Sequence, residues 1–269
     1  MITIILAIVV AGGGYCGAYY GLDWGIGWSV FAGIVCFGVF QAVFGIMIQK
    51  RVKRDMEGVQ NILAAGQKRL QAKMQRWQMR PPGSIQQAQK EIFEDTKVFV
   101  KEALKEVDVL AKYKWWVPMI ERQMATAKLQ LNWMIKEFKV VDSLMPKAML
   151  IDPTMVAMKM ARMYTQNASS DEIVKVYDKG VRRVRYNGNV LLAATMSWIL
   201  VKRDEVDRAF KVLTEALKKS DNEVLKTNHV NLMNNRVAHF SNSQLGDQWY
   251  SLYLEEPKVH TQRQRSVYR

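Results

Sequence analysis

Two apolar runs at the start of the chain constrain its fold more than any other sequence feature. Residues 2–20 and 28–48 are almost uninterruptedly apolar, and Asp23 is the only charged side chain in this region. Each run has about the 20 residues that a helix needs to cross the hydrocarbon core of a bilayer. The intervening residues 21–27 contain three glycines, which favour a turn. The sequence therefore predicts a transmembrane hairpin of two antiparallel helices, residues 1–48.

A cleavable signal peptide is the alternative interpretation of the first run. Signal peptides begin with basic residues, and polar sequence follows their cleavage site. This chain begins Met-Ile-Thr, without Lys or Arg, and its second apolar run follows at once. The hairpin is therefore favoured over a cleaved signal.

The charges after the second run indicate the orientation of the hairpin. Four basic residues follow it directly: Lys50, Arg51, Lys53 and Arg54. Because positively charged residues concentrate on the cytoplasmic side of membrane helices, we expect the rest of the chain to lie in the cytoplasm, at the inner membrane of a bacterium. We also expect these four side chains to face anionic lipid headgroups.

Glycines recur every fourth residue in and just after the first run, at Gly13, Gly17 and Gly21. They fall on one face of a helix, where small residues allow a second backbone to approach closely. We expect this face to pack against the second helix of the hairpin. A seam between two copies of the chain is the alternative, and it would make the protein a homo-oligomer.

A basic helix is predicted directly after the hairpin, over residues 49–83. It ends at a Pro-Pro-Gly sequence, because proline disfavours helix in the residue before it. Its basic residues outnumber its acidic ones, which suits either contact with anionic lipid or a solvated charged face.

A long antiparallel helical hairpin with coiled-coil-like packing is predicted over residues 84–149. Ser84 and Gln87 form a capping box at the start of its first helix. Pro118 falls in the first turn of its second helix, where apolar residues alternate at spacings of four and three up to Met145.

From residue 150 to 256 the predicted helices are shorter and recur with a period of about 36 residues, typical of stacked helix pairs. Two pairs carry small and large residues at fixed places: Ala161, Tyr164, Ile173, Tyr177 and Gly180 in the first, and Ser197, Leu200, Ala209, Leu213 and Ala216 in the second. A third pair falls at residues 222–236 and 241–254, the latter opening with a capping box of Ser241 and Gln244. In these positions the chain resembles the tetratricopeptide repeat family. A helical solenoid of another kind is the alternative.

The resemblance implies a concave surface, formed by the first helices of the pairs, that binds an extended peptide of a partner protein. The positions that would line this surface are Met158, Arg162, Thr165, Trp198, Lys202, Asn228, Asn235 and Arg236. Amide side chains can hydrogen-bond a peptide backbone, and Arg or Lys can pair with a carboxylate. Core packing or solvation is the alternative explanation of each of these residues.

The charge balance and the few reactive side chains narrow the function. The chain has 39 Lys and Arg against 25 Asp and Glu, a net charge of +14, and residues 257–269 form a basic tail predicted to be disordered. Both cysteines, Cys16 and Cys36, lie in the apolar runs, and no nucleotide-binding, nucleophile or metal-binding motif occurs. We therefore expect no cofactor, no metal site and no enzymatic activity.

Taken together, these patterns predict an all-α protein with a transmembrane hairpin, a long helical hairpin and a repeat domain resembling an α-solenoid. We expect a membrane-anchored scaffold or assembly factor that binds a partner protein at the cytoplasmic face. The alternative is a regulatory or structural membrane subunit that binds a polyanion through its basic surface. Anionic lipid is favoured over nucleic acid, because the basic segments carry few aromatic residues and no nucleic-acid motif.

Overall fold

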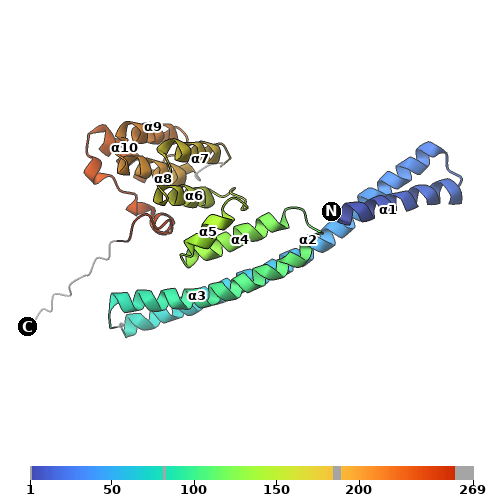
Figure 1. The fold of residues 1–269 in the computed structure, drawn as a ribbon, viewed down its shortest axis with the longest axis horizontal. Helices are drawn as coiled ribbons and strands as arrows, with labels where there is room; N and C mark the ends of the chain where they lie inside the picture. Colours follow the sequence, from blue (N-terminus) through green and yellow to red (C-terminus); the bar gives the residue numbers. More distant parts are fainter. Residues whose placement is uncertain (1, 81–82, 184–188, 258–269) are drawn as a thin grey trace, which may run out of the picture. The chain divides into compact units, whose positions relative to one another are not determined.

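The computed structural model describes residues 2–80, 83–183 and 189–257, which form helices joined by turns and contain no β-strand (Figure 1). The predicted all-α class is confirmed for these residues. The prediction of a disordered tail over residues 257–269 falls almost wholly outside them.

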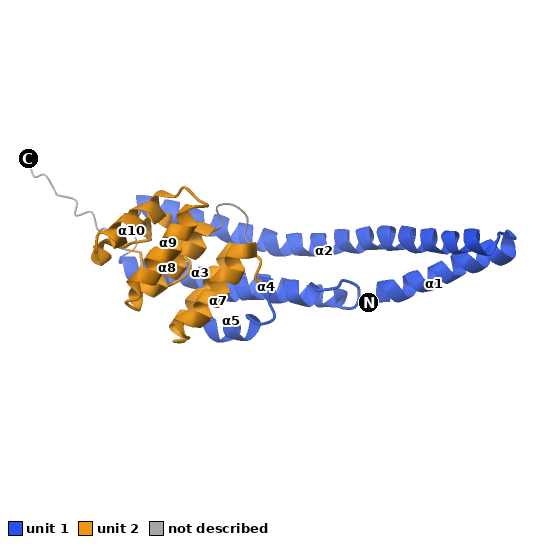
Figure 2. Cartoon of the chain, turned by 90° about the horizontal axis from the view of Figure 1, so that it is seen from above, with its two compact units in different colours: residues 1–149 blue, residues 150–269 orange. Residues whose placement is uncertain are grey.

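The chain divides into two compact units, residues 1–149 and 150–269 (Figure 2). The first unit begins with α1 (Ile2–Cys16), which continues through a π-helical turn, η1 (Gly17–Gly21). This helix then packs against the beginning of α2 (Ile26–Met79), which runs back alongside it (Figure 1). Both helices are long and apolar enough to cross a membrane.

The apolar side chains of this hairpin point mostly outward. Ile5, Val9 and Ile34 are 61%, 65% and 64% exposed. A helix in the core of a water-soluble protein buries such side chains, whereas a continuous outward apolar surface marks a site of contact with lipid or with another protein. Two candidate membrane-spanning helices are therefore present near the N-terminus.

The second candidate span and the basic helix predicted after it are one helix. α2 continues without a break from its apolar stretch to Met79. Residues 49–54 contain neither Pro nor Gly, so nothing in the local sequence interrupts the helix. At a rise of 1.5 Å per residue, α2 extends about 45 Å beyond residue 48.

Two glycines bring α1 and α2 into close contact. A methyl group at Gly14 would lie 2.7 Å from the Cys36 Sγ, and one at Gly33 would lie 3.0 Å from the Ala11 carbonyl oxygen. Both positions therefore require the smallest residue for the two helices to approach as closely as they do.

The glycines that were predicted to make this contact do not make it. Around the Cβ positions of Gly13, Gly17 and Gly21, no atom of a neighbouring element lies within 4 Å. Gly14 faces α2 and Gly13 does not, because successive residues are rotated by about 100° around a helix. The prediction that these three glycines pack the hairpin is wrong. The alternative, a seam between two copies, stays a prediction.

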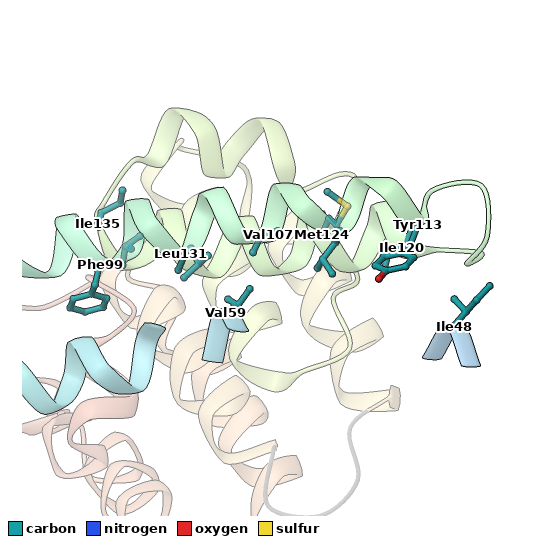
Figure 3. Close-up of a cluster of buried hydrophobic side chains, with 12 residues drawn as sticks. Ile48, Val59, Phe99, Val107, Tyr113, Ile120, Met124, Leu131 and Ile135 are labelled. Atoms are coloured by element: carbon teal, nitrogen blue, oxygen red, sulfur yellow. The ribbon is translucent and has the colours of Figure 1, made fainter. Parts of the chain in front are cut away.

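Beyond the candidate spans, α2 packs along α3 (Ile85–Val109), and α3 packs against α4 (Ile120–Met134). One cluster of buried side chains joins the three helices: Ile48, Val59, Phe99, Val100, Ala103, Val107, Leu110, Tyr113, Ile120, Met124, Leu131 and Ile135 (Figure 3). A Cβ at Gly66 would overlap the Phe99 ring, so this glycine leaves the space that the ring fills between α2 and α3. The apolar stripe of the basic helix is thus covered by protein.

The ends of the predicted long hairpin match the sequence only in part. The Ser84 hydroxyl accepts a hydrogen bond from the Gln87 N–H at 3.1 Å, as predicted. The Gln87 side chain, however, bonds to Glu91 and does not complete the capping box. Pro118 lies before α4 and not in its first turn, because Met119 takes the left-handed conformation (φ 68°).

The second helix of the predicted hairpin is broken. α4 is followed, after a turn, by the shorter helix α5 (Phe138–Leu144). Lys136 is left-handed (φ 58°), and the Glu137 N–H donates to the Asn132 carbonyl at 3.0 Å. This is the Schellman pattern of a helix end. The turn therefore interrupts an apolar periodicity that predicted one long helix.

The second unit consists of helix pairs. We call α6 (Pro153–Thr165), α8 (Asn189–Lys202) and α10 (Glu223–Met233) the A helices, and α7 (Ser170–Arg183) and α9 (Val206–Leu217) the B helices. α8 packs against α6, α7 and α9, and α10 packs against α9. Figure 1 shows the B helices on one side of α6 and α8.

The positions that carry the repeat resemblance lie where these helices pack. Nine of the ten are buried: Ala161, Ile173, Tyr177, Gly180, Ser197, Leu200, Ala209, Leu213 and Ala216. Tyr164 is partly buried. A methyl group at Gly180 would lie 2.8 Å from a Val156 methyl carbon, so the first pair also crosses closely. Membership of the repeat family stays a prediction.

Each A helix ends in the same kind of turn. The left-handed residue is Asn167 after α6 (φ 57°), Asp204 after α8 (φ 60°) and Asn235 after α10 (φ 56°). The N–H of the next residue donates to the carbonyl five residues earlier, at 2.9, 2.9 and 2.8 Å. Lys136 makes this turn after α4, and α4, α6, α8 and α10 begin 33, 36 and 34 residues apart. Within the described residues, the same turn geometry therefore ends four helices whose starts are nearly evenly spaced.

The second half of the predicted third pair is not a long helix. After α10 the chain forms the 3₁₀ turns η4 (Val237–His239) and η5 (Ser243–Leu245) and the single-turn helix α11 (Asp247–Tyr250). The Ser241 hydroxyl donates to the Ser243 hydroxyl and accepts from the Ser243 N–H, not from the Gln244 N–H, so the predicted capping box with Gln244 is wrong. Gly246 (φ 59°, ψ −135°) adopts a conformation outside the helical region, which ends any helix before it.

Candidate functional site

The side of the A helices predicted to hold a partner peptide is covered by the chain itself. The C-terminal segment, residues 240–257, returns to α8 on the side away from α9 (Figure 1). The Asn242 side chain donates to the Ala194 carbonyl at 2.9 Å, and Trp249 and Leu252 are buried. The segment therefore packs on the central A helix.

Aromatic side chains and one carboxylate hold the segment in place. The Trp198 ring contacts the rings of Tyr164 and Trp249 edge-on, with centroids 5.3 and 5.7 Å away. Glu255 accepts hydrogen bonds from the indole N–H groups of Trp198 and Trp249, each at 2.8 Å. Hydrogen bonds to an ionised carboxylate are stronger than neutral ones, so Glu255 ties the end of the segment to α8.

The side-chain amide of Asn228, on α10, binds the backbone of the C-terminal segment. Its amide donates to the Ser241 carbonyl and accepts from the Ser241 N–H, both at 3.0 Å. It also donates to the Asn242 side chain at 2.9 Å. This is the two-way recognition of a peptide backbone that the sequence predicted for such an asparagine, but the backbone belongs to this chain.

The predicted partner-groove residues fall into two groups. Met158, Trp198 and Asn228 are 8%, 4% and 1% exposed, so the expectation that they line an open groove is corrected. The others lie near the C-terminal ends of the A helices and are partly or fully exposed: Arg162, Thr165, Lys202, Asn235 and Arg236. These accessible side chains lie beside the recurring left-handed turns.

A polar network joins the starts of the two B helices. Arg208 donates to Asp171 at 2.8 Å and to Glu205 at 2.6 Å, and Glu205 also accepts from the Ser170 hydroxyl. The hydrogen bond with Asp171 raises the pKa of the Arg208 guanidinium. The contacts of Ser170 with Glu205 and of Asp171 with Arg208 join residues 35 and 37 positions apart in sequence, and so hold equivalent points of successive pairs together.

A second candidate site lies where the apolar stretch of α2 ends. We call it the interfacial pocket. It has a volume of about 550 Å³ and is lined by Phe44, Met47, Ile48, Arg51, Arg54, Lys112, Tyr113 and Trp116. The rings of Phe44 and Trp116 lie 5.5 Å apart, so the connection between α3 and α4 closes one side of the pocket. Five of these side chains are apolar or aromatic, and three are basic.

Asp55 fastens this connection to α2. Its Oδ2 accepts hydrogen bonds from the Lys112 ammonium at 2.7 Å and the Tyr113 hydroxyl at 3.0 Å. The bond with Lys112 lowers the pKa of the Asp55 carboxyl and raises the pKa of the Lys112 ammonium. The Ile2 N–H donates to the Trp115 carbonyl at 3.2 Å. The connection therefore lies level with the beginning of α1.

The four basic residues predicted to face lipid are exposed, but they are not equivalent. Arg51 and Arg54 line the interfacial pocket, whereas Lys50 and Lys53 do not. Farther along α2, Lys73 is paired with Asp95 at 2.7 Å and with Glu91 at 3.1 Å.

Sequence reasoning missed the residues that complete both sites. Lys112 directly precedes a Tyr-Lys-Trp-Trp-Val string, residues 113–117, which contains Trp116. This string predicts only a turn between two helices, although its tryptophans are typical of a membrane interface. Trp249 and Glu255 lie 51 and 57 residues from Trp198, and no local pattern could have paired them with it.

Among the described residues, no group of His, Cys, Asp and Glu side chains could hold a metal ion. Comparison with family models, with curated proteins and with solved structures finds no significant match to this chain. The function is therefore inferred from sequence and geometry.

Proposed function

We propose that this protein is a membrane-anchored helical-repeat scaffold or assembly factor that holds a partner protein at the cytoplasmic face of the membrane. The observation that carries the proposal is that α4, α6, α8 and α10 begin 33 to 36 residues apart and that each of them ends in the same left-handed turn. This interval is close to the 34 residues of a tetratricopeptide repeat. Stacked helix pairs of this type form extended surfaces that are used for binding.

The two apolar stretches would supply the anchor. Their exposed surface suits lipid, and the basic residues after the second stretch favour a cytoplasmic location for the remainder of the chain. Because α2 passes from its apolar stretch into the packed part of the first unit as one helix, the anchor is joined to that part without a flexible linker.

The partner surface that we propose is the row of A-helix ends. The inner side of the A helices is already occupied by the C-terminal segment, whereas Lys202, Asn235 and Arg236 are exposed. Lys and Arg at the ends of successive A helices suit acidic side chains of a partner.

Site-specific photo-crosslinking tests this surface. A photoreactive residue is placed at Lys202 or Arg236 in the full-length protein, and at Lys211, which is exposed on α9, as the matched control. We expect the first two positions to yield the same discrete crosslinked protein in the source cells and the control position to yield none. Equal products from all three positions, or none from any, would contradict the proposal.

A second candidate function is polyanion binding by the far end of α2. Lys68, Arg69 and Arg76 are exposed, and Arg76 lies about 40 Å from Lys50 along the helix axis. A charge at that distance is screened from lipid headgroups, because the Debye length is about 8 Å at physiological ionic strength. Nucleic acid is therefore the polyanion to test here. Strongly salt-dependent binding that is lost on neutralising these three residues would support it, and salt-independent or absent binding would exclude it.

A further inference from the structure

We propose that the interfacial pocket binds one acidic phospholipid of the cytoplasmic leaflet, with the lipid phosphate between Arg51 and Arg54. The inference rests on the membrane anchorage proposed above but not on the partner surface. The interfacial pocket is also separate from the basic residues at the far end of α2, since its lining includes neither Arg69 nor Arg76.

The order of residues along α2 matches the order of groups in a phospholipid. Phe44 and Met47 belong to the apolar stretch, Ile48 is buried, and Arg51 and Arg54 follow. Met47 and Arg54 are about 10 Å apart along the helix axis. An acyl chain beside Phe44 and Met47 would therefore place the lipid phosphate near the two arginines.

The charges of the pocket favour an anion. Arg51 and Arg54 are three residues apart, so they lie on the same side of α2. Within the described residues, neither forms an ion pair. The nearby Asp55, whose carboxyl also feels the charge of Arg54, is ion-paired with Lys112 at 2.7 Å. Two guanidinium groups that form no ion pair with a carboxylate are suited to phosphate, which accepts their N–H groups in pairs.

The apolar wall favours a lipid over a soluble phosphate. Trp116 is held against Phe44, and the Trp115 carbonyl is held by the Ile2 N–H. Tryptophan side chains concentrate at the level of lipid headgroups. The pocket is thus preformed at the depth where a lipid passes from acyl chain to headgroup, and Met47, which is 40% exposed, leaves its apolar half accessible.

The test compares two double substitutions in the full-length protein, reconstituted in nanodiscs of phosphatidylcholine with a minor fraction of phosphatidylglycerol. Arg51→Gln with Arg54→Gln removes the two pocket charges. Lys50→Gln with Lys53→Gln removes the same charge from the same two turns of α2 but not from the pocket. Native mass spectrometry then counts the phosphatidylglycerol retained by the released protein, and glycerol phosphate is added as a soluble competitor.

We expect the arginine pair to lower the affinity for phosphatidylglycerol by roughly tenfold or more, since each basic residue near an anionic surface contributes roughly a fivefold factor. We expect the lysine pair to change it by less than about threefold. Equal losses in both variants would mean general surface attraction and would overturn the proposal, as would no loss in either. Displacement of the lipid by glycerol phosphate would identify a soluble phosphate as the ligand. Failure of the unsubstituted protein to enter nanodiscs would instead contradict the anchorage.

Discussion

The candidate membrane hairpin exposes its large apolar side chains, whereas the second unit buries them between its helices. In the hairpin, Ile5 and Val9 face outward and glycines mediate the contact between helices. In α8, by contrast, Leu192, Met196 and Ile199 are fully buried. Water drives large apolar side chains into a core, but lipid does not, so helices in lipid rely on small residues and close packing. The residues at a helix contact therefore indicate which solvent surrounds it.

The largest effect should come from truncating the core of the second unit. Leu213→Ala should cost roughly 2–5 kcal/mol, because Leu213 is fully buried between the helix pairs and its loss leaves a cavity. Met233→Ala, at a side chain that is 60% exposed, should change stability by no more than about 0.5 kcal/mol. Hydrogen exchange of the α8 and α9 amides in the detergent-solubilised protein measures both. Equal protection in the two variants would show that α9 does not pack as described.

The part of α2 beyond the apolar stretch should behave like a water-soluble core, with a smaller effect. Gly66→Ala should cost about 1–3 kcal/mol, because the added methyl group displaces the Phe99 ring, although alanine is otherwise the better helix former. Gly45→Ala is the control in the same helix, since no neighbouring atom lies within 4 Å of its Cβ position. Thermal unfolding should separate the two variants, and a gain of stability from Gly66→Ala would mean that α2 and α3 are not in close contact.

Substitutions at the contact between α1 and α2 should have a smaller effect on stability than Gly66→Ala. Gly14→Ala should weaken the packing of α1 on α2 by about 1 kcal/mol, the low end of the cost of overpacking, since Cys36 can shift. Gly17→Ala adds a methyl group that meets no neighbouring atom in one copy of the chain. Resistance of the protein to unfolding in mixed detergent micelles gives the comparison. If Gly17→Ala proved the more disruptive and also dissociated an oligomer, the seam between copies would be the true role of that face.

The smallest effect concerns the pH dependence of the Asp55 contacts. A carboxyl whose pKa is lowered in the folded protein stabilises it above the ordinary value of 3.8, and this contribution is lost as the pH falls through the lowered value. Asp55→Asn should therefore reduce stability slightly at neutral pH and flatten its fall below pH 3.8. Thermal unfolding at a series of pH values, with Glu57→Gln, at an exposed carboxylate of the same helix, as the control, should show this difference. An unchanged pH profile would mean that the connection between α3 and α4 is not held by Asp55.

Local patterns predicted the helices, but not all of their contacts or ends. The apolar stretches, the Ser84 cap and the buried positions Ala161, Ala209 and Leu213 follow from residue type and spacing in one segment. The turn at Lys136 does not, because lysine carries no preference for the left-handed conformation and tertiary packing selects it.

The candidate sites were less predictable than the fold. Gly14 and Gly13 are adjacent glycines in one apolar run, and only the rotation of α1 against α2 decides which of them makes the contact. The bond from Trp198 to Glu255 and the ring contact of Phe44 with Trp116 join residues 57 and 72 positions apart, at distances over which periodicity carries no information. The sequence identified Asn228 as a polar residue on an A helix, but it did not predict that the C-terminal segment covers this residue.

We propose above that residues 1–48 form two membrane spans and that the remainder of the chain lies in the cytoplasm. Cysteine accessibility tests it most directly, in full-length protein with Cys16→Ala and Cys36→Ala as the background. Leu22→Cys lies in the turn between the spans and Ser84→Cys between α2 and α3, and both positions are exposed. With a membrane-impermeant maleimide on right-side-out vesicles, we expect Leu22→Cys to be labelled at once and Ser84→Cys only after the membrane is permeabilised. Labelling of both positions in sealed vesicles, or of Ser84→Cys alone, would contradict the claim.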